Sequence, residues 1–141
     1  MRRVLVLYPL LDTFRGARAA EHRHLLDLLG IELVLADREI DTPLASLFSE
    51  RVRLPEPEDS AAAWACVQRL LERKPCDAIF AQTEASLLVG SLAVRALGVR
   101  GIGVEAAHLT TNKFRSRSAM AARGVPQPAF ALVSSVEQAR L

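Results

Sequence analysis

A regular alternation of short aliphatic runs with longer helical stretches constrains the fold more than any other feature of the sequence. Residues 4–8 are apolar on both faces, as expected of a central parallel strand that helices cover on each side. Similar runs recur at residues 31–36, 78–81 and 101–105. Because parallel strands need helical crossovers, the pattern predicts an α/β fold with an open, mainly parallel sheet of four to five strands and helices on both faces.

Four segments between or after these runs have helical patterns, each with a stop after it and three with a capping residue before it. These segments are residues 14–29, 61–73 and 84–97, and a later helix that runs through Ala122. The expected caps are Asp12 or Thr13, Ser60, and Thr110 or Thr111, and the expected stops are Gly30, Pro75, Gly98 and Gly124.

Two stretches follow the pattern poorly. Residues 37–58 carry three prolines and several charges, which predicts irregular structure with a short edge strand at 52–54. Near the end, residues 130–133 resemble a strand, and Ser135 is expected to open a helix over 136–140. We therefore expect one α/β domain over residues 1–126 and the start of a connection to a further domain over 127–141.

Composition narrows the class of protein. Eighteen Lys and Arg against 16 Asp and Glu give a net charge of +2 with no dominant block, so nothing demands a nucleic-acid partner. Cys66 and Cys76 have no CxxC or Cys/His grouping and are expected to be buried and reduced. The first apolar run ends at Asp12 without a cleavage site, and no stretch could span a membrane, which favours a cytoplasmic protein.

Several common sites are disfavoured by missing motifs. No GxGxxG follows the first strand, which offers only Gly16, so a classical NAD site is not expected. His22, His24 and His108 do not form a metal-ligand set. The serines lack a GxSxG elbow, which disfavours serine-hydrolase chemistry.

Polar residues follow the predicted strands, at the edge where open α/β sheets bind ligands. They are Asp12, Asp37, Arg38, residues 82–84, which end in Glu84, and residues 105–108, which run from Glu105 to His108. For Asp12 and Glu84 the alternative is that each only caps or charges a helix N-terminus. For His108 the alternative is a solvated loop position.

A basic cluster marks the last full helix. Lys113 and Arg117 are four residues apart and so share one face, with Arg115 between them. Cations near a helix N-terminus suit an anionic ligand such as a phosphate, although a solvated face would look the same.

The second half of the chain resembles the N-terminal, pre-ATP-grasp domain of ATP-grasp carboxylate-amine ligases, a group similar to biotin carboxylase and to amino-acid and dipeptide ligases. The resemblance covers residues 76–141, whereas residues 1–75 match only as a generic strand-helix-strand start. It is carried by pieces in the family's order: residues 77–80, Glu84, residues 93–101, Asn112-Lys113, Arg117 and residues 124–128. The family more often has Asp where this chain has Asn112.

The resemblance implies a full enzyme that uses ATP and Mg²⁺ to phosphorylate a carboxylate, after which an amine attacks the acyl phosphate. It implies that Lys113, with Arg117, contacts ATP, and that Glu84 and residues 105–107, which begin with Glu105, border the pocket for small-molecule carboxylate and amine substrates. Asp12 and His108 are expected at the same pocket from their place at the predicted strand ends. Metal ligands would lie in further domains, so this chain alone would be inactive and would bind no cofactor by itself. Homodimerisation is left open.

Two other classes of function compete with a ligase domain. One is a stand-alone Rossmann-like module that binds a small anion or regulates, and this hypothesis expects a natural end at Leu141. The other is an interaction protein that uses the apolar helix at 84–97 as an association face. The mass of the intact natural product separates the ligase domain from the stand-alone module, and a monomer in solution would count against the interaction protein.

Overall fold

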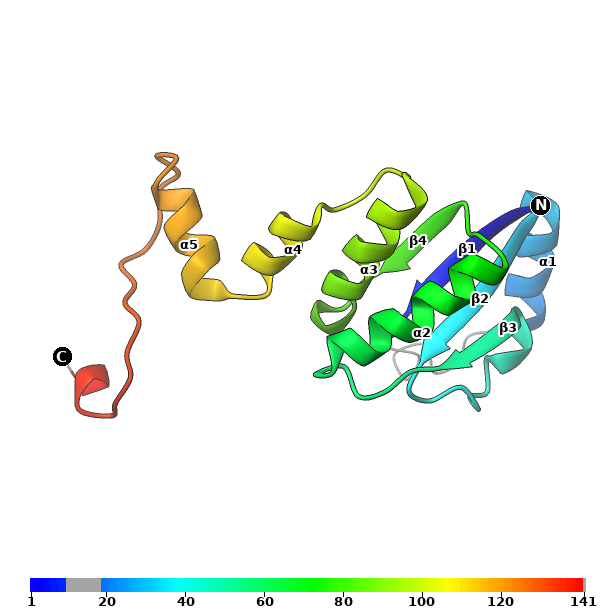
Figure 1. Cartoon of the computed structure of the whole chain (residues 1–141), viewed down its shortest axis with the longest axis horizontal. Coiled ribbons are helices and arrows are strands. Elements are labelled where there is room, and N and C mark those ends of the chain that lie inside the picture. Colours follow the sequence, from blue (N-terminus) through cyan, green and yellow to red (C-terminus); the bar gives the residue numbers. More distant parts are fainter. Residues whose placement is uncertain (10–18, 141) are drawn as a thin grey trace.

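The computed structural model describes residues 1–9 and 19–140, and its centre is a four-stranded sheet. The strands are β1 (Arg2–Leu7), β2 (Ile31–Asp37), β3 (Phe48–Arg53) and β4 (Ala78–Ala81). All neighbours pair in parallel in the order β3-β2-β1-β4. Figure 1 shows the sheet with its helices, which confirms the predicted open parallel α/β class.

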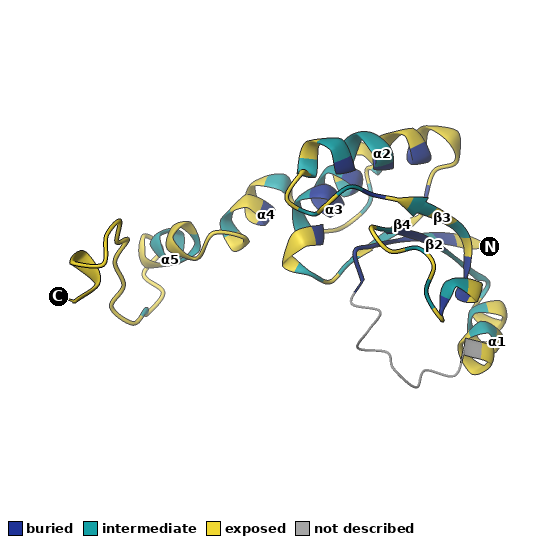
Figure 2. Cartoon of the chain, turned by 90° about the horizontal axis from the view of Figure 1, so that it is seen from below, coloured by how far each residue is buried: buried dark blue, intermediate teal, exposed yellow. Residues whose placement is uncertain are grey.

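Helices lie on both faces of the sheet (Figure 2). α2 (Ser60–Arg73) and α3 (Glu84–Leu97) cover one face, while α1 (Ala19–Leu29) and the 3₁₀ turn η2 (Ala45–Leu47) cover part of the other. The larger core lies under α2 and α3, where Leu5 and Leu7 of β1 meet Val67, Leu70 and Val89. Full burial of such a side chain stabilises the fold by about 1.5–3 kcal/mol, so this layer fixes the sheet against its helices.

α3 lies unusually close to β4. A Cβ added to Gly90 would stand 2.7 Å from the Cβ of Ala81, so glycine is what permits this approach. The helix begins with a capping box between Thr83 and Ser86 and ends at Gly98, whose φ of 66° is left-handed. Ser86, Val89, Gly90, Ser91 and Ala93 are buried, so α3 is a core helix and not the exposed association face that the interaction hypothesis required.

The predicted strand at 101–105 is wrong, because α4 (Val104–Thr110) begins there. Gly101 folds back onto α3, where an added Cβ would lie 2.7 Å from a methyl of Val94. Ala107 is then buried, and α4 packs against α3. Residues 130–133 also form no strand, and all four are exposed.

Two helix starts differ from the prediction. Asp59, not Ser60, caps α2 by accepting from the amide of Ala62. Asn112 caps a separate helix, α5 (Lys113–Ala121), whereas the hydroxyls of Thr110 and Thr111 donate back to the carbonyl of Ala107. Asp12, Thr13 and the predicted first turns at 14–18 lie outside the described residues.

Two further boundaries are refined. β3 has six residues instead of the three expected at 52–54, and it forms one edge of the sheet. Ser135 does accept from a following amide, that of Gln138, but the element it opens is only the 3₁₀ turn η3 (Gln138–Arg140).

A C-terminal arm, defined as residues 104–140, leads away from the sheet (Figure 1). α4 packs against α3 and α5 packs against α4, but no side chain of α5 is buried. An edge-to-face contact joins Phe114 to Phe130, with ring centroids 5.8 Å apart. The proposed division of the chain at residue 126 falls within this arm and stays a prediction.

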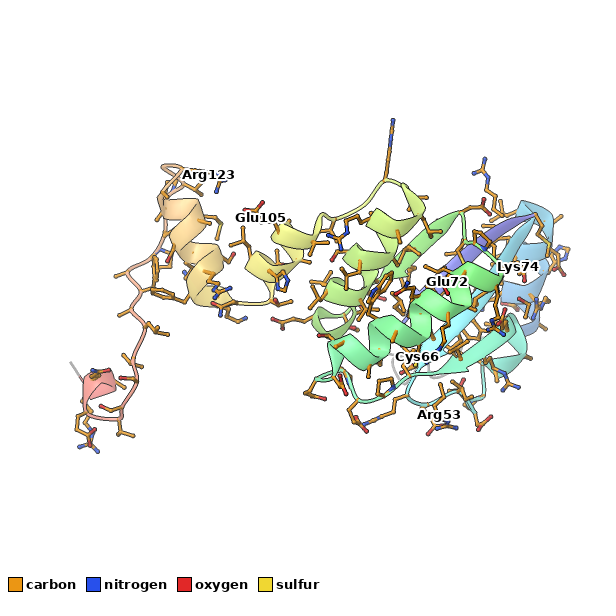
Figure 3. The ribbon with its side chains drawn as sticks, viewed as in Figure 1. Arg53, Cys66, Glu72, Lys74, Glu105 and Arg123 are labelled. Carbon is orange, nitrogen blue, oxygen red and sulfur yellow. The ribbon has the colours of Figure 1, made fainter. Side chains whose placement is uncertain are left out.

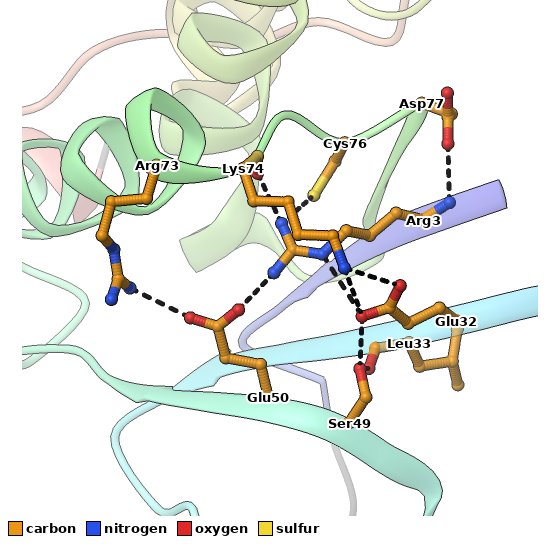
Figure 4. A network of polar contacts seen from close by, with 9 residues as sticks. All are labelled: Arg3, Glu32, Leu33, Ser49, Glu50, Arg73, Lys74, Cys76 and Asp77. Atoms are coloured by element: carbon orange, nitrogen blue, oxygen red, sulfur yellow. Dashed lines mark hydrogen bonds and ion pairs between the residues drawn. The ribbon is translucent and has the colours of Figure 1, made fainter. Parts of the chain in front are cut away.

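A buried arginine organises the opposite end of the sheet, where the strands begin (Figure 4). Arg3 is 3% exposed, and its guanidinium pairs with Glu50 and lies 3.5 Å from a carboxylate oxygen of Glu32. The same guanidinium donates to the carbonyl of Lys74 and to the sulfur of Cys76. Arg3 thus joins β1 to β2, to β3 and to the connection before β4.

Cys76 is buried, as expected, and burial raises the pKa of its thiol. Cys66 is only partly buried, and both cysteines are free thiols. No helix among residues 1–9 and 19–140 has the length and apolar character needed to cross a membrane.

Candidate functional site

The carboxyl ends of the strands bring together residues from each connection that follows a strand. Asp37 is the last residue of β2, and burial raises the pKa of its half-buried carboxyl group. That carboxylate accepts from the amide of Arg38 at 2.7 Å, while the exposed guanidinium of Arg38 pairs with Glu56 at 3.0 Å. Asp37 and Arg38 therefore lie at the edge that the sequence predicted.

Tyr8 was not singled out from the sequence at this edge, whereas Thr83 lies within the predicted range 82–84. Tyr8 directly follows β1, is 5% exposed, and donates its phenolic hydrogen to the carbonyl of Pro55 at 2.9 Å. Desolvation, reinforced by the charge of Asp37, raises the pKa of Tyr8 to about 12, so the phenol stays a donor at neutral pH. The hydroxyl of Thr83 donates to the carbonyl of Tyr8 at 3.1 Å. The available signal for Tyr8 was position alone, since it is the last residue of the predicted strand at 4–8.

Glu84 is the first residue of α3 and is exposed beside this edge. The cap of α3 is the side chain of Thr83, so Glu84 is not needed as a capping group. Its carboxylate still complements the helix dipole, and it remains accessible to a ligand. Asp12 lies outside the described residues.

Glu105 and His108 do not follow a strand, since the fifth strand is replaced by α4. Both are exposed on that helix, which packs against α3 and α5. Figure 3 shows Glu105 on the arm, apart from the sheet. The predicted polar residues therefore divide between two places, the strand ends and the arm.

A small polar pocket of about 260 Å³ lies where α4 meets α5. Lys113 and Arg117 both line it, together with Thr110, Ser116, Met120 and Gln127. Lys113 is the first residue of α5, where helix amides and the positive end of the dipole favour an anion. The side-chain oxygen of Asn112 caps the helix and accepts from the amide of Arg115 at 2.9 Å. Because this side chain is a neutral amide, the cap places no carboxylate beside Lys113.

The described residues hold no group of three or more His, Cys, Asp and Glu side chains that could bind a metal ion. The pocket beside Lys113 also has no carboxylate among its lining residues. Because Mg²⁺ takes oxygen ligands that usually include carboxylates, the pocket suits the anionic part of a ligand and not the metal.

A second hollow is larger and apolar. It has a volume of about 320 Å³ and lies on the α1 face of the sheet. Its lining is Val4, Val6, Pro9, His22, Leu26, Ile31, Leu33, Leu44, Leu47, Phe48 and Phe80. This lining offers few polar groups to orient a substrate. The candidate sites are therefore the polar pocket between α4 and α5, here called the arm pocket, and the strand ends.

Comparison with known proteins identifies the fold. No family model and no curated protein matches the sequence. Among solved structures, L-amino acid ligase from Bacillus licheniformis is similar over 98% of this chain and 34% of its own, with a TM-score of 0.72 and 18% identity. Glycinamide-RNase-transformylase T from Mycobacterium tuberculosis is similar over 99% of this chain and 37% of its own, with a TM-score of 0.65 and 21% identity.

A third structure is an ADP complex of N5-carboxyaminoimidazole ribonucleotide synthetase, or PurK. It is similar over 99% of this chain and 33% of its own, with a TM-score of 0.64 and 17% identity. The chain thus spans about a third of the length of these solved proteins and has the fold of the pre-ATP-grasp domain.

Proposed function

We propose that this chain is the N-terminal substrate-binding domain of an ATP-dependent carboxylate-amine ligase that acts through an acyl phosphate. The observation that carries the proposal is the pocket at the start of α5, where Lys113 and Arg117 lie together on a fold shared with ligases. Charge that develops on a transferring phosphoryl group must be neutralised by cations, and Lys and Arg are suited to that role.

In this proposal Lys113 and Arg117 contact the phosphates of ATP. The two side chains are one helical turn apart on α5, so both can reach the same anion. Arg117 is partly buried and its fork can hold two oxygens, while the exposed Lys113 supplies a compact charge at the helix N-terminus. Thr110, Ser116 and Gln127 add groups that can hydrogen-bond to the anion.

The strand ends are proposed to border the carboxylate or amine substrate. Glu84 is exposed there and can accept from an ammonium group, as can Asp12 by its place in the sequence. Glu105 and His108 are proposed to face the same substrate from the arm. Mg²⁺ would be held by residues outside this chain. The chain alone is therefore expected to bind neither cofactor productively and to be inactive.

Replacing Lys113 tests the assignment of the ATP site. In the full-length enzyme, Lys113→Ala should raise the KM for ATP or lower kcat by about 10-fold or more, because a charge-assisted contact contributes about 1.5–3 kcal/mol. The thermal unfolding midpoint should not change, since Lys113 is exposed.

Arg115→Ala is the matched control. It removes a cation from the same exposed helix, but Arg115 does not line the pocket. Equal ATP kinetics in wild type and Lys113→Ala, or equal losses in both variants, would contradict the assignment.

A stand-alone anion-binding or regulatory module is the second candidate. It is favoured by the same pocket, which is built wholly from residues of this chain. Denaturing mass spectrometry of the intact product from its natural host separates the two. A mass well above 15.4 kDa supports the ligase domain, whereas 15.4 kDa supports the module.

A further inference from the structure

Tyr8 has a backbone conformation that a bulky side chain rarely adopts. Its φ is 41°, and it is the one non-glycine residue with positive φ in the described part of the chain. Such a conformation costs about 1–3 kcal/mol and persists only where surrounding contacts hold it in place. The hydrogen bonds of Tyr8 are therefore the contacts that maintain its strained backbone conformation.

Three hydrogen bonds connect Tyr8 to the other three strands or the loops that follow them. Its amide donates to the carbonyl of Ala36 near the end of β2, at 3.0 Å. Its phenol donates to Pro55 in the connection from β3 to α2, and its carbonyl accepts from Thr83 in the connection from β4 to α3. A single residue at the end of β1 thus joins all four strand ends.

These bonds reach the segments that carry the polar residues of this edge. Pro55 is followed within a few residues by Glu56 and by Asp59, the cap of α2. Thr83 is followed by Glu84, the exposed carboxylate proposed to face the substrate. Rotation about φ moves the ring and the carbonyl of Tyr8 together relative to its amide, which is bonded to Ala36, so the observed φ of 41° places both groups at their partners.

We infer that Tyr8 is a positioning residue. It holds the β3–α2 and β4–α3 connections at the spacing that substrate binding at the carboxyl ends of the strands requires. The part of this inference that concerns substrate rests on the proposed function. Tyr8 does not itself touch the substrate, because its side chain is buried and its hydroxyl is occupied by Pro55. Its effect is therefore expected on substrate affinity and not on ATP, which is assigned to the arm pocket.

The first test needs no activity. Tyr8→Phe removes the hydroxyl and keeps the ring, so hydrogen exchange of the amides at residues 56–60 should become about 10-fold faster. Thr83 is kept unchanged, because its side chain also caps α3, and its loss would speed exchange at residues 84–86 for that reason alone. Ser91→Ala is the control, because its buried hydroxyl bonds only to Leu88 within α3.

Unchanged exchange at residues 56–60 in Tyr8→Phe would overturn the inference, whatever the enzyme does. Equal changes in Ser91→Ala would also overturn it, because the effect would then be a general loss of stability.

The second test uses the full-length enzyme. In Tyr8→Phe the KM for the carboxylate or the amine should rise about 5- to 10-fold, while kcat and the KM for ATP stay within about two-fold of wild type, as expected when only uniform binding is lost. Unchanged KM values with faster loop exchange would remove the substrate role. A wild-type enzyme that forms no amide from ATP and any carboxylate and amine would instead overturn the proposed function.

Discussion

Among single residues in the described part of the chain, the buried guanidinium of Arg3 is the charged group most fully removed from water. Taking a charge out of water is costly, and here two carboxylates, a carbonyl and a sulfur compensate for it. Glu32 also accepts from Ser49 at 2.8 Å and pairs with Lys74 at 3.1 Å, and these contacts hold the pKa of its carboxyl below the usual range. The cluster therefore stays charged and paired at neutral pH.

Removing this guanidinium should destabilise the fold strongly. Arg3→Ala is expected to lower the free energy of unfolding by about 3–5 kcal/mol, because Glu32 and Glu50 would keep their charges and lose their buried partner. Urea unfolding monitored by circular dichroism measures the change. Arg38→Ala breaks an exposed ion pair with Glu56 and should leave the midpoint unchanged. A loss as small for Arg3 as for Arg38 would contradict this view of the cluster.

Residues differ in how far the sequence could reveal them. Asp37 and Glu84 were placed at the strand ends, because a strand pattern fixes where its last residue points. Arg3 and Tyr8 were not foreseen. Their partners lie 29–74 positions away in the sequence for Arg3 and 28–75 for Tyr8, so only the folded sheet brings them together. Whether Lys113 and Arg117 bind ATP stays a prediction, although they do share a pocket.

At the scale of elements, the contact between α3 and β4 depends on the missing side chain of Gly90. Gly90→Ala should lower the free energy of unfolding by about 1–3 kcal/mol, even though alanine favours helices, because its methyl would overlap Ala81 on the strand. Thermal and urea unfolding both report this. Gly103→Ala, where an added Cβ meets nothing within 4 Å, should cost about 0.5 kcal/mol or less. A stabilised Gly90→Ala variant would show that α3 can move away from the sheet freely.

The elements with long periodic patterns were predicted well, and the short ones were not. Residues 84–97 form a helix with the predicted bounds, because fourteen residues of helical pattern with a glycine stop leave little choice. Residues 101–105 are only five long, and their aliphatic side chains suit a strand or the start of a helix equally. Packing of Gly101 against Val94 and of Ala107 into the helix layer decided for the helix.

At the scale of the whole molecule, the sheet with α1 to α3 and the arm contribute very differently to stability. Both core clusters consist of residues before the arm, and α5 buries no side chain. The polar groups that the sequence assigned to one edge of the sheet are also divided between these two parts. Once the fifth strand is replaced by α4, residues after Gly103 no longer end at the sheet.

A chain that stops at Thr111 should therefore keep its stability. Its thermal unfolding midpoint is expected within about 3 °C of that of the 141-residue chain, because the removed residues bury little apolar surface. A chain that stops at Gly103 also loses α4, with the buried Ala107, and should unfold at a lower temperature. A large loss on removing only residues 112–141 would mean that the arm supports the sheet.

The sheet order also determines when this fold can be completed during synthesis. β1 is made first, yet one of its two neighbours is β4, and Val4 pairs with Ala78, 74 residues later. Until that part of the chain leaves the ribosome, one edge of β1 has no partner, whereas β2 and β3 can already be in place. The entropy of closing so long a loop is lost before the contacts between β1 and β4 form. We therefore expect β4 and α3 to pack last, against a sheet of β1, β2 and β3 that has already formed.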